Sequence, residues 1–481
     1  MSTTTLLSLL LSLYAVVTGI FLISENRRPQ STLAWMLAFI FAPGLGVALY
    51  LFFGRNRKAF ARQDKLLSQR IDERLVPALS EIFDREECRA RELAKQGASQ
   101  RKLLLLITRN SLSSLTTRNA VEIQQDASTY YPALMKDIEG AEHSIHLQTF
   151  IWRVDSFTDR LKDLLAAKVR DGVQVRLLYD PVGSFLAITP GYLRRMRAAG
   201  IQMVATSPLY HLHTISYRNH RKIAVVDGKV GYLGGMNMGQ EHLDGGAYTV
   251  WRDTQLRLRG EAAALLQAIF LVDWYNATRQ DLFADTQFLV ELPDADGPAA
   301  PVQILTSGPD SRWEATRQQY EQMIVAAQRH VYIQTPYFIL DSSIAEVLSI
   351  AAMAGTEVKV MLSAPGPLDR IASWAANTFI ADVMKAGVRV FFHDHAYLHA
   401  KTISIDSEIC SIGSANFDIR SFSINYELNA VIYSQSYARE LEAAFERDLL
   451  HCSELTLEEY QQRPVLSRFR DSTARLFSPL L

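Results

Sequence analysis

The chain has 481 residues, which is long for a single domain, and its composition of 48% hydrophobic and 21% charged residues is that of a globular protein rather than a disordered one. The formal net charge of −1 excludes the bulk basic field that is typical of non-specific nucleic-acid binders. The three cysteines, Cys88, Cys410 and Cys452, fit neither a disulfide framework nor a zinc site.

The N-terminus carries two uncharged apolar runs separated by a polar turn. The first, Leu6 to Ile23, is long enough to cross a bilayer, and the second, Leu33 to Phe53, contains Pro43. No basic residue precedes the first run and no small-residue cleavage site follows it, so a cleaved signal peptide is the weaker alternative. We expect a two-helix transmembrane hairpin over residues 1–56. Basic residues after the second run predict that the rest of the chain lies in the cytoplasm.

Residues 57–102 are charged and compatible with a helix, either as a solvated connector or as a basic amphipathic helix on the membrane surface. After this connector the chain reads as two copies of one α/β unit, over 103–295 and 296–481. In each copy a strand ending in Gln-Thr and an aromatic residue (143–152 and 329–338) precedes a helical segment and a second strand. This order predicts parallel strands covered by helices, with the two halves related by a pseudo-two-fold axis.

Each half then contains a stretch with the same intervals, "HRKIAVVDGKVGYLGGMN" from His220 and "HAKTISIDSEICSIGSAN" from His399. Residues two apart on a strand point the same way, so each histidine is expected to share a face with its lysine. Asparagine and serine side chains at the ends of the stretches can donate hydrogen bonds to an anionic oxygen. The candidate site residues are His220, Lys222, Asp227 and Asn237 in the first stretch and His399, Lys401, Asp406, Ser414 and Asn416 in the second.

Two histidines and two lysines around one pocket suit a phosphodiester. The lysines would neutralise its non-bridging oxygens, while one imidazole attacks phosphorus and the other protonates the departing alkoxide. We therefore expect neither a metal nor another cofactor. A single His-x-Lys strand is more often a surface pair, and only the repeated spacing argues for chemistry. The alternating pairs His211/His213 and His393/His395 suggest chelation, but no third ligand is spaced to complete a site.

At these residues the sequence resembles the phospholipase D superfamily, whose hallmark is H-x-K-x4-D-x6-G-[GS]-x-N, and within it the bacterial cardiolipin synthase family. The segments "LLYDPVGS", "QTPYF" and "GSANFDIRSFSINYE" also agree, and the resemblance extends over the whole chain. It implies two phospholipase-D-like halves. It also implies one acidic residue after each motif to hold the histidine, which would be Asp253 for the first copy and Glu427 for the second.

The resemblance further implies that two phosphatidylglycerol molecules become cardiolipin and glycerol. His220 would be the nucleophile that forms a phosphatidyl-histidine, and His399 the general acid. The partners would be phosphatidylglycerol and the lipid bilayer, with no nucleic acid, in a multi-pass protein of the bacterial inner membrane. The motifs leave open a hydrolase that yields phosphatidic acid, a membrane-tethered nuclease and an inactive scaffold. They do not indicate the oligomeric state.

Overall fold

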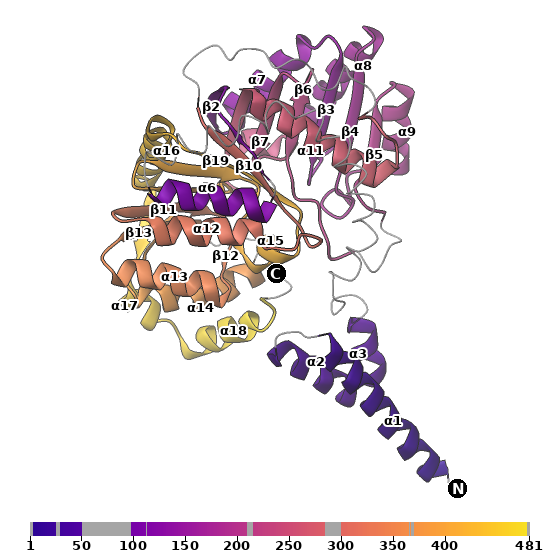
Figure 1. Ribbon diagram of the computed structural model, residues 1–481, viewed down its shortest axis with the longest axis vertical. Helices are drawn as coiled ribbons and strands as arrows, with labels where there is room; N and C mark the ends of the chain where they lie inside the picture. Colours follow the sequence, from indigo (N-terminus) through magenta and orange to yellow (C-terminus); the bar gives the residue numbers. More distant parts are fainter. Residues whose placement is uncertain are drawn as a thin grey trace.

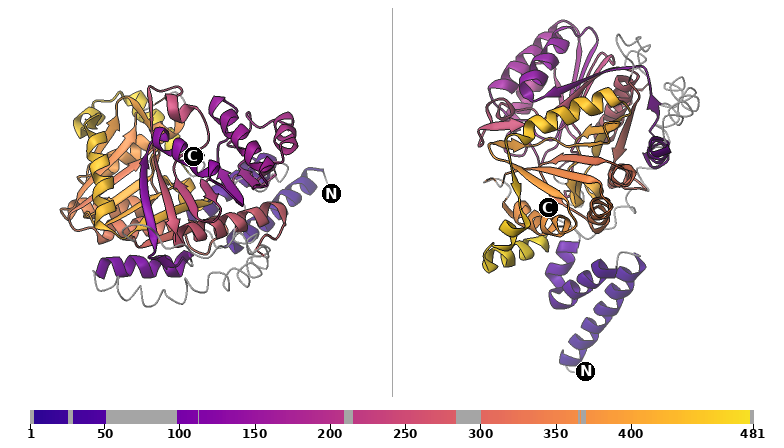
Figure 2. Two further views of the ribbon diagram at one scale, coloured as in Figure 1. Left: turned by 90° about the horizontal axis from the view of Figure 1, so that it is seen from above. Right: turned by 90° about the vertical axis from the view of Figure 1, so that its left-hand side faces the viewer.

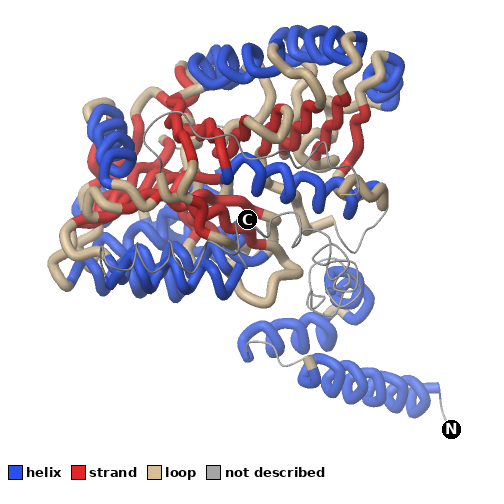
Figure 3. The backbone as a smooth tube through the Cα atoms, turned by 45° about the horizontal axis from the view of Figure 1, so that its top comes forward, coloured by secondary structure: helices blue, strands red, loops and turns tan. Residues whose placement is uncertain are grey.

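A computed structural model describes residues 3–25, 29–50, 98–111, 113–208, 215–283, 300–364, 366 and 370–478. Most of the predicted connector, up to residue 97, and the histidines His211 and His213 lie outside these residues. The described chain forms two β-sheets with covering helices, and three further helices at the N-terminus (Figure 1, Figure 2 and Figure 3).

The first half is built on a seven-stranded sheet of order β2-β9-β7-β6-β3-β4-β5. Its strands are β2 (Asn119–Gln125), β3 (Ser144–Thr149), β4 (Gln174–Tyr179), β5 (Gln202–Ala205), β6 (Ile223–Val226), β7 (Val230–Gly234) and β9 (Thr254–Gly260). Its helices are α7 (Ala127–Glu139), α8 (Ser156–Arg170), α9 (Pro190–Ala198), α10 (Glu241–Asp244) and α11 (Glu261–Thr278). Strands β3, β4 and β5 are parallel, and the other pairs in this sheet are antiparallel.

The second half has a nine-stranded sheet of order β1-β10-β19-β17-β16-β11-β13-β14-β20. Its strands are β1 (Leu115–Thr116), β10 (Val302–Ser307), β11 (His330–Thr335), β13 (Glu357–Ser363), β14 (Arg389–His393), β16 (Thr402–Ile405), β17 (Ile409–Gly413), β19 (Glu427–Ile432) and β20 (Cys452–Leu455). Its helices are α12 (Ala315–Ala326), α13 (Ser342–Met353), α14 (Arg370–Met384), α15 (Ile419–Ser423), α16 (Gln435–Leu449), α17 (Leu457–Gln461) and α18 (Val465–Arg475). Two short strands, β12 (Phe338–Ile339) and β18 (Phe417–Asp418), pair with each other outside this sheet.

The two halves are copies of one unit. Without its end strands β1 and β20, the second sheet has the same strand order and the same parallel and antiparallel pairs as the first. The strand–helix–strand units β3–α8–β4 and β11–α13–β13 lie where the sequence predicts them, with parallel strands in both. The prediction of an α/β fold with two repeated halves is confirmed.

The halves pack against each other through apolar side chains of both sheets. One buried cluster joins residues of the first half, such as Val225 and Leu256, to residues of the second, such as Ile412 and Ala430. Each half also has a core of its own beneath its helices. Burying apolar surface between the sheets fixes the relative position of the two halves, which is what a site shared between them requires.

The boundary between the halves differs from the prediction. Helix α6 (Ala98–Ser111) packs against α12 and β10, and β1 pairs with β10, so residues 98–116 belong to the second sheet although they precede the first half. The physical reason is burial: Leu103 and Ile107 complete the apolar core of the second half. Helices α6, α12, α13, α14 and α18 contact one another in that order (Figure 1).

The N-terminal segment forms α1 (Thr3–Ser24), α2 (Pro29–Phe41) and α3 (Pro43–Leu49). The second predicted apolar run is therefore not one helix, because α2 ends before Pro43, whose ring suits the first turn of a new helix. Among the described residues, no helix meets the length and apolarity that a membrane crossing requires. Leu22, Phe39 and Tyr50 form a small buried cluster of their own.

Candidate active site

The two His-x-Lys pairs come together between the halves. His220 and Lys222 lie immediately before β6, and His399 and Lys401 immediately before β16, so each pair occupies the same place in its unit. All four side chains are buried. Backbone hydrogen bonds join the two halves at both histidines, and after burial the charges of both lysines lower the pKa of each imidazole. The structure thus brings together the histidines and lysines that the sequence selects.

Each histidine is held by a carboxylate from the opposite half. Nδ1 of His220 lies 3.0 Å from Oε2 of Glu427, and Nδ1 of His399 lies 2.7 Å from Oδ2 of Asp253. The expectation that Asp253 serves the first histidine and Glu427 the second is therefore wrong, because the partners are exchanged. A carboxylate at Nδ1 orients the imidazole and leaves Nε2 for chemistry.

The exchange follows from backbone pairing between the halves. Strand β8 (Val250–Arg252) pairs in parallel with β15 (Ala396–Leu398), and the His399 amide donates to the Arg252 carbonyl at 2.7 Å. In the other direction, the His220 amide donates to the Tyr426 carbonyl at 2.9 Å. The residue after each of these carbonyls is the carboxylate, Asp253 or Glu427, so each acid is delivered beside the histidine of the other half.

Burial dominates the acid–base properties of the site. It lowers the pKa of His220 to about 4 despite the opposing charge of Glu427, and it lowers the pKa of His399 well below its ordinary value. Burial also lowers the pKa of Lys401 to about 8 and that of Lys222 well below its usual range. An anionic ligand would reverse these effects, since its charge stabilises the protonated form of every one of these groups.

The two carboxylates differ in their surroundings. Burial tends to raise the pKa of Glu427, but His220, Lys222 and the Ser414 hydroxyl outweigh it and the pKa is lowered. The Ser414 hydroxyl donates to Oε2 of Glu427 at 2.5 Å. At Asp253 burial prevails over the charge of Lys401, and the pKa is raised. The equivalent of Ser414 in the first half is Gly235, where any side chain would collide with the Asp253 carboxylate.

The predicted lysines and amide side chains also have partners within the protein. Lys222 donates to the carbonyl of His220 at 2.7 Å, and Lys401 donates to that of His399. The side-chain oxygen of Asn237 accepts from the Ile151 amide at 3.1 Å. Asn416 donates to Asp418 at 3.0 Å. Asn237, Ser414 and Asn416 therefore shape the loops beside the histidines, and Ser414 reaches the site through Glu427.

The structure does not bring Asp227 and Asp406 to the site. Each lies at the far end of its strand, where both carboxylate oxygens accept backbone N–H groups that begin the neighbouring strand. Each also has a positive φ, 52° for Asp227 and 55° for Asp406, as a tight turn requires. The spacing of the motif predicts both aspartates as site residues, but their contacts are structural.

Aromatic side chains outside the motifs line the site. The ring of Phe150 lies 4.9 Å from that of His220, and Trp251 and Tyr397 each lie 5.7 Å from His399 between ring centroids. His242 lies 6.2 Å from His399. Sequence reasoning missed these residues, although two of them adjoin segments that it used. Phe150 is the aromatic residue that follows Gln-Thr within 143–152, and Tyr397 precedes the second motif by two residues.

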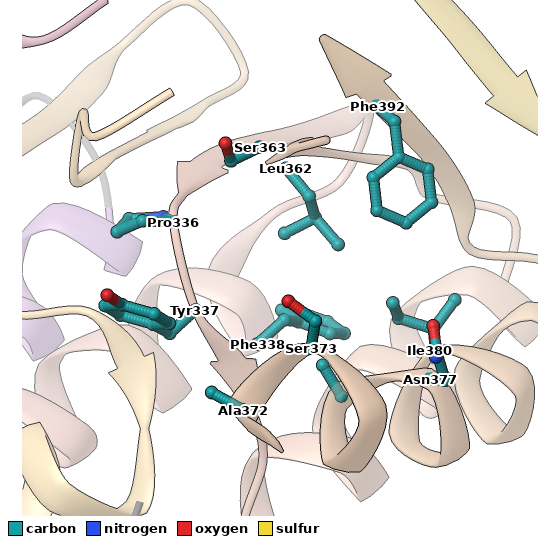
Figure 4. A pocket seen from close by; sticks show the side chains of 11 residues that line it. Pro336, Tyr337, Phe338, Leu362, Ser363, Ala372, Ser373, Asn377, Ile380 and Phe392 are labelled. Carbon is teal, nitrogen blue, oxygen red and sulfur yellow. The ribbon is translucent and has the colours of Figure 1, made fainter. Parts of the chain in front are cut away.

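A small, open depression is lined by residues of β12, β13, β14 and α14 in the second half. Figure 4 shows Leu362 and Phe392 on the strand side facing Ser373, Asn377 and Ile380 of α14. Its wall residue Tyr337 lies 3.1 Å from Tyr397 between hydroxyl oxygens, and the Leu398 amide donates to the Ser363 hydroxyl at 3.3 Å. These bonds connect the depression, whose lining is mixed polar and apolar, to the two residues that precede His399.

Among the described residues no group of three or more His, Cys, Asp or Glu side chains is arranged to hold a metal. His393, one of the histidines that suggested chelation, accepts a hydrogen bond from the Ala396 amide through Nδ1 at 3.1 Å. The groups that face one another in the site are two imidazoles, each backed by a carboxylate, and two ammonium groups. This arrangement defines a phosphodiester-transferring site shared by two homologous halves.

Comparison with known proteins agrees with this class. Residues 134–274 and 320–449 match the family described as cardiolipin synthase, PLD-like domain, and residues 10–55 match the phospholipase D-nuclease N-terminal family. A cardiolipin synthase of Alkalihalophilus pseudofirmus is 37% identical over 99% of this chain and 94% of its own length. The major cardiolipin synthase of Bacillus subtilis is 37% identical over 99% of both chains. This chain belongs to the phospholipase D-like cardiolipin synthase family.

Among solved structures, phosphatidylserine synthase of Haemophilus influenzae is similar in fold. The TM-score is 0.61 at 13% sequence identity, over 80% of this chain and 100% of that one. At this identity the likeness supports the two-half architecture alone.

Proposed function

We propose that this chain is a cardiolipin synthase that converts two phosphatidylglycerol molecules into cardiolipin and glycerol through a phosphatidyl-histidine intermediate. The observation that carries the proposal is the facing pair of carboxylate-backed histidines, in a chain that matches cardiolipin synthases over nearly its whole length.

In the first step, Nε2 of His220 attacks phosphorus, the P–N bond forms and the P–O bond to glycerol breaks. His399 gives its proton to the departing glycerol oxygen. The Glu427 carboxylate, whose low pKa keeps it charged, stabilises the positive charge that develops on the His220 imidazole. Lys222 and Lys401 stabilise the charge on the non-bridging oxygens. This electrostatic support favours His220 as the nucleophile.

In the second step, a glycerol hydroxyl of another phosphatidylglycerol attacks the same phosphorus. His399 now takes the proton of that hydroxyl, the new P–O bond forms and the P–N bond breaks. One phosphodiester replaces another, so bond energies are nearly balanced. The amounts of lipid and glycerol then set the direction of reaction.

The main alternative is hydrolysis, in which water replaces the second lipid and phosphatidic acid is the product. The histidines would act identically, and the outcome depends on how well the bound lipid excludes water. A nuclease is the weaker alternative, because the chain has a net charge of only −1.

The decisive experiment incubates the purified protein with phosphatidylglycerol in detergent, without nucleotide, and resolves the products by mass. Cardiolipin with an equal amount of glycerol is the expected result. Phosphatidic acid alone would establish hydrolysis and overturn the transferase. No lipid product from folded protein would overturn both.

We infer that residues 1–56 hold the enzyme at the bacterial inner membrane, with the catalytic halves on the cytoplasmic side. Apolar side chains such as Leu13, Ile20, Leu37 and Phe41 are exposed along α1 and α2, which supports contact with lipid. The transmembrane hairpin stays a prediction. Reaction of engineered cysteines with an impermeant reagent, from either side of the membrane, would test the topology.

A further inference from the structure

The last helix, α18, is attached to the second half by one face. Asp471 on this face is fully buried and lies 2.8 Å from Arg463 and 3.0 Å from Arg470. Asn377 of α14 donates a hydrogen bond to Asp471 at 3.1 Å, and Ala474, one turn further on, is also buried. A buried carboxylate with three donors fixes the rotation of the helix about its axis, and therefore determines which side faces outward.

The outward face of α18 is apolar. Five large hydrophobic side chains at the helix and just beyond it are between 50% and 79% exposed: Val465, Leu466, Phe469, Leu476 and Phe477. At 100° per residue, Val465, Phe469 and Leu476 fall within a narrow arc, and Leu466 and Phe477 border it on one side. We call these five residues the α18 strip. A contiguous strip of this kind on a water-facing surface is typical of an interaction site.

Arginines border the α18 strip on both sides. Arg470 follows one edge and its guanidinium lies 4.5 Å from the Trp374 ring centroid. Arg468 and Arg475 follow the other edge, where Arg475 lies 3.0 Å from Asp382 and 4.3 Å from the Phe379 ring centroid. The aromatic contacts hold two of the three guanidinium groups near the surface of α14. Asp471 and Asp382 pair with Arg470 and Arg475, so the face has an apolar centre and a border in which three arginines outnumber two aspartates.

We propose that the α18 strip is a second membrane contact of this protein. In this arrangement α18 lies on an anionic lipid bilayer, with its apolar side chains among the acyl chains and its arginines at the phosphates. An apolar stripe flanked by arginines is the pattern of helices that lie in the membrane interface. Figures 1 and 2 show α18 at the end of the two-sheet body from which α1–α3 extend, so both contacts can engage one membrane.

The charge of the rim favours lipid over a second copy of the chain. A symmetric contact between two α18 strips would bring their arginine borders together, which is unfavourable. An anionic surface instead attracts the excess positive charge of the borders. The proposal rests on the proposed function only in that a membrane phospholipid is the substrate. It adds that α18, which packs on α14, holds the second half of the enzyme against the bilayer.

The test places a nitroxide label at Phe469→Cys in the full-length chain, with Cys88, Cys410 and Cys452 replaced by alanine. Glu458→Cys on the exposed, polar helix α17 is the matched control position. The protein is reconstituted in vesicles with and without phosphatidylglycerol, and the label's accessibility to oxygen, which enriches in lipid, is compared with that to a water-soluble nickel chelate. We expect the label at 469 to favour oxygen over nickel severalfold more than the label at 458, and more strongly with phosphatidylglycerol present.

Equal accessibility at the two positions in phosphatidylglycerol vesicles would overturn the proposal. A second contrary outcome is a label at 469 that is inaccessible to both reagents and shows spin–spin broadening in vesicles of either composition. This result would also overturn the proposal, because a second copy of the chain would then cover the strip. Cardiolipin formation is measured in the same vesicles. Its absence would tell against the proposed function without affecting the measured position of α18.

Discussion

At the scale of single residues, the exchange of carboxylates between the halves links each acid to one chemical step. Glu427 contacts His220 and Asp253 contacts His399. A donor with p-nitrophenol as leaving group needs no proton from a general acid. We therefore expect Asp253→Asn to lose turnover of phosphatidylglycerol on the order of 10³- to 10⁴-fold, as for other carboxylate-supported histidines, but to keep a burst of p-nitrophenol. Glu427→Gln is expected to lose both activities.

Matched controls are His399→Ala for Asp253→Asn and His220→Ala for Glu427→Gln. A rapid-quench assay of p-nitrophenol release distinguishes the two groups. If Asp253→Asn behaved like His220→Ala, the exchanged pairing would be incorrect. If the variants at positions 253 and 399 lost both activities while those at 427 and 220 kept the burst, the pairing would stand and His399 would be the nucleophile.

His242, which lies beside His399, is expected to affect both stability and activity. It is buried, and neither ring nitrogen has a hydrogen-bond partner in the described part of the protein. Burial lowers its pKa to about 3, so the folded state keeps it neutral while the unfolded chain binds a proton below about pH 6.5. Proton binding to this histidine therefore favours the unfolded state as the pH falls from about 6.5 toward 3. The free energy of unfolding decreases by up to about 1.4 kcal/mol per pH unit.

Replacing His242 by Phe removes this cost and keeps a ring among Tyr131, Trp251 and His399. We expect the Tm difference between His242→Phe and wild type to favour the variant more at pH 5 than at pH 7.5. Turnover of phosphatidylglycerol is expected to fall, because the variant lacks the two ring nitrogens that could form hydrogen bonds with the substrate. Thermal unfolding at several pH values tests the first part, with the exposed His395→Phe as control. Parallel curves would contradict it.

At the scale of elements, the motif aspartates act as clamps between strands. Asp227, at the end of β6, accepts the amides of Glu142, His143 and Ser144, each at 2.8 Å, and so fixes the start of β3. Asp227→Asn keeps a residue type that tolerates positive φ but replaces an acceptor oxygen by a donor. We expect a loss of about 1–3 kcal/mol in unfolding free energy, with turnover of the folded enzyme largely kept.

The measurement pairs chemical denaturation with kcat at a temperature where the variant is fully folded. Asp406→Asn, which removes the same clamp in the second half, should give the same result. A large loss of kcat in fully folded protein would restore the catalytic role that motif spacing suggested for these residues.

At the scale of the whole molecule, the sequence predicts well the features whose residues lie close together in the chain. The strand–helix–strand units and the positions of His220 and His399 follow from local patterns that occur twice. The pairs His220–Glu427 and His399–Asp253 join residues 207 and 146 positions apart, through backbone pairing that no local pattern encodes. The place of α6 is similar: its apolar face predicts burial, but nothing within it specifies the second sheet.

The separation of the N-terminal helices from the cores of the two halves leads to a prediction about the whole protein. Leu22, Phe39 and Tyr50 form a cluster that shares no residue with the buried clusters of the sheets. Removal of residues 1–56 is therefore expected to leave the Tm of the catalytic body nearly unchanged. Binding to vesicles should weaken strongly but not vanish, because the α18 strip remains.

Vesicle flotation and thermal unfolding of the shortened chain measure these two effects. Binding that remains should require phosphatidylglycerol and be lost on Leu466→Glu with Phe469→Glu, since two buried charges among acyl chains cost more than a short helix gains. Turnover of a short-chain, water-dispersed phosphatidylglycerol should persist in the shortened chain, because the hydrogen bonds that hold the histidines and lysines of the site come from the two halves themselves. A shortened chain that no longer unfolds cooperatively would instead show that the N-terminal helices support the catalytic fold itself.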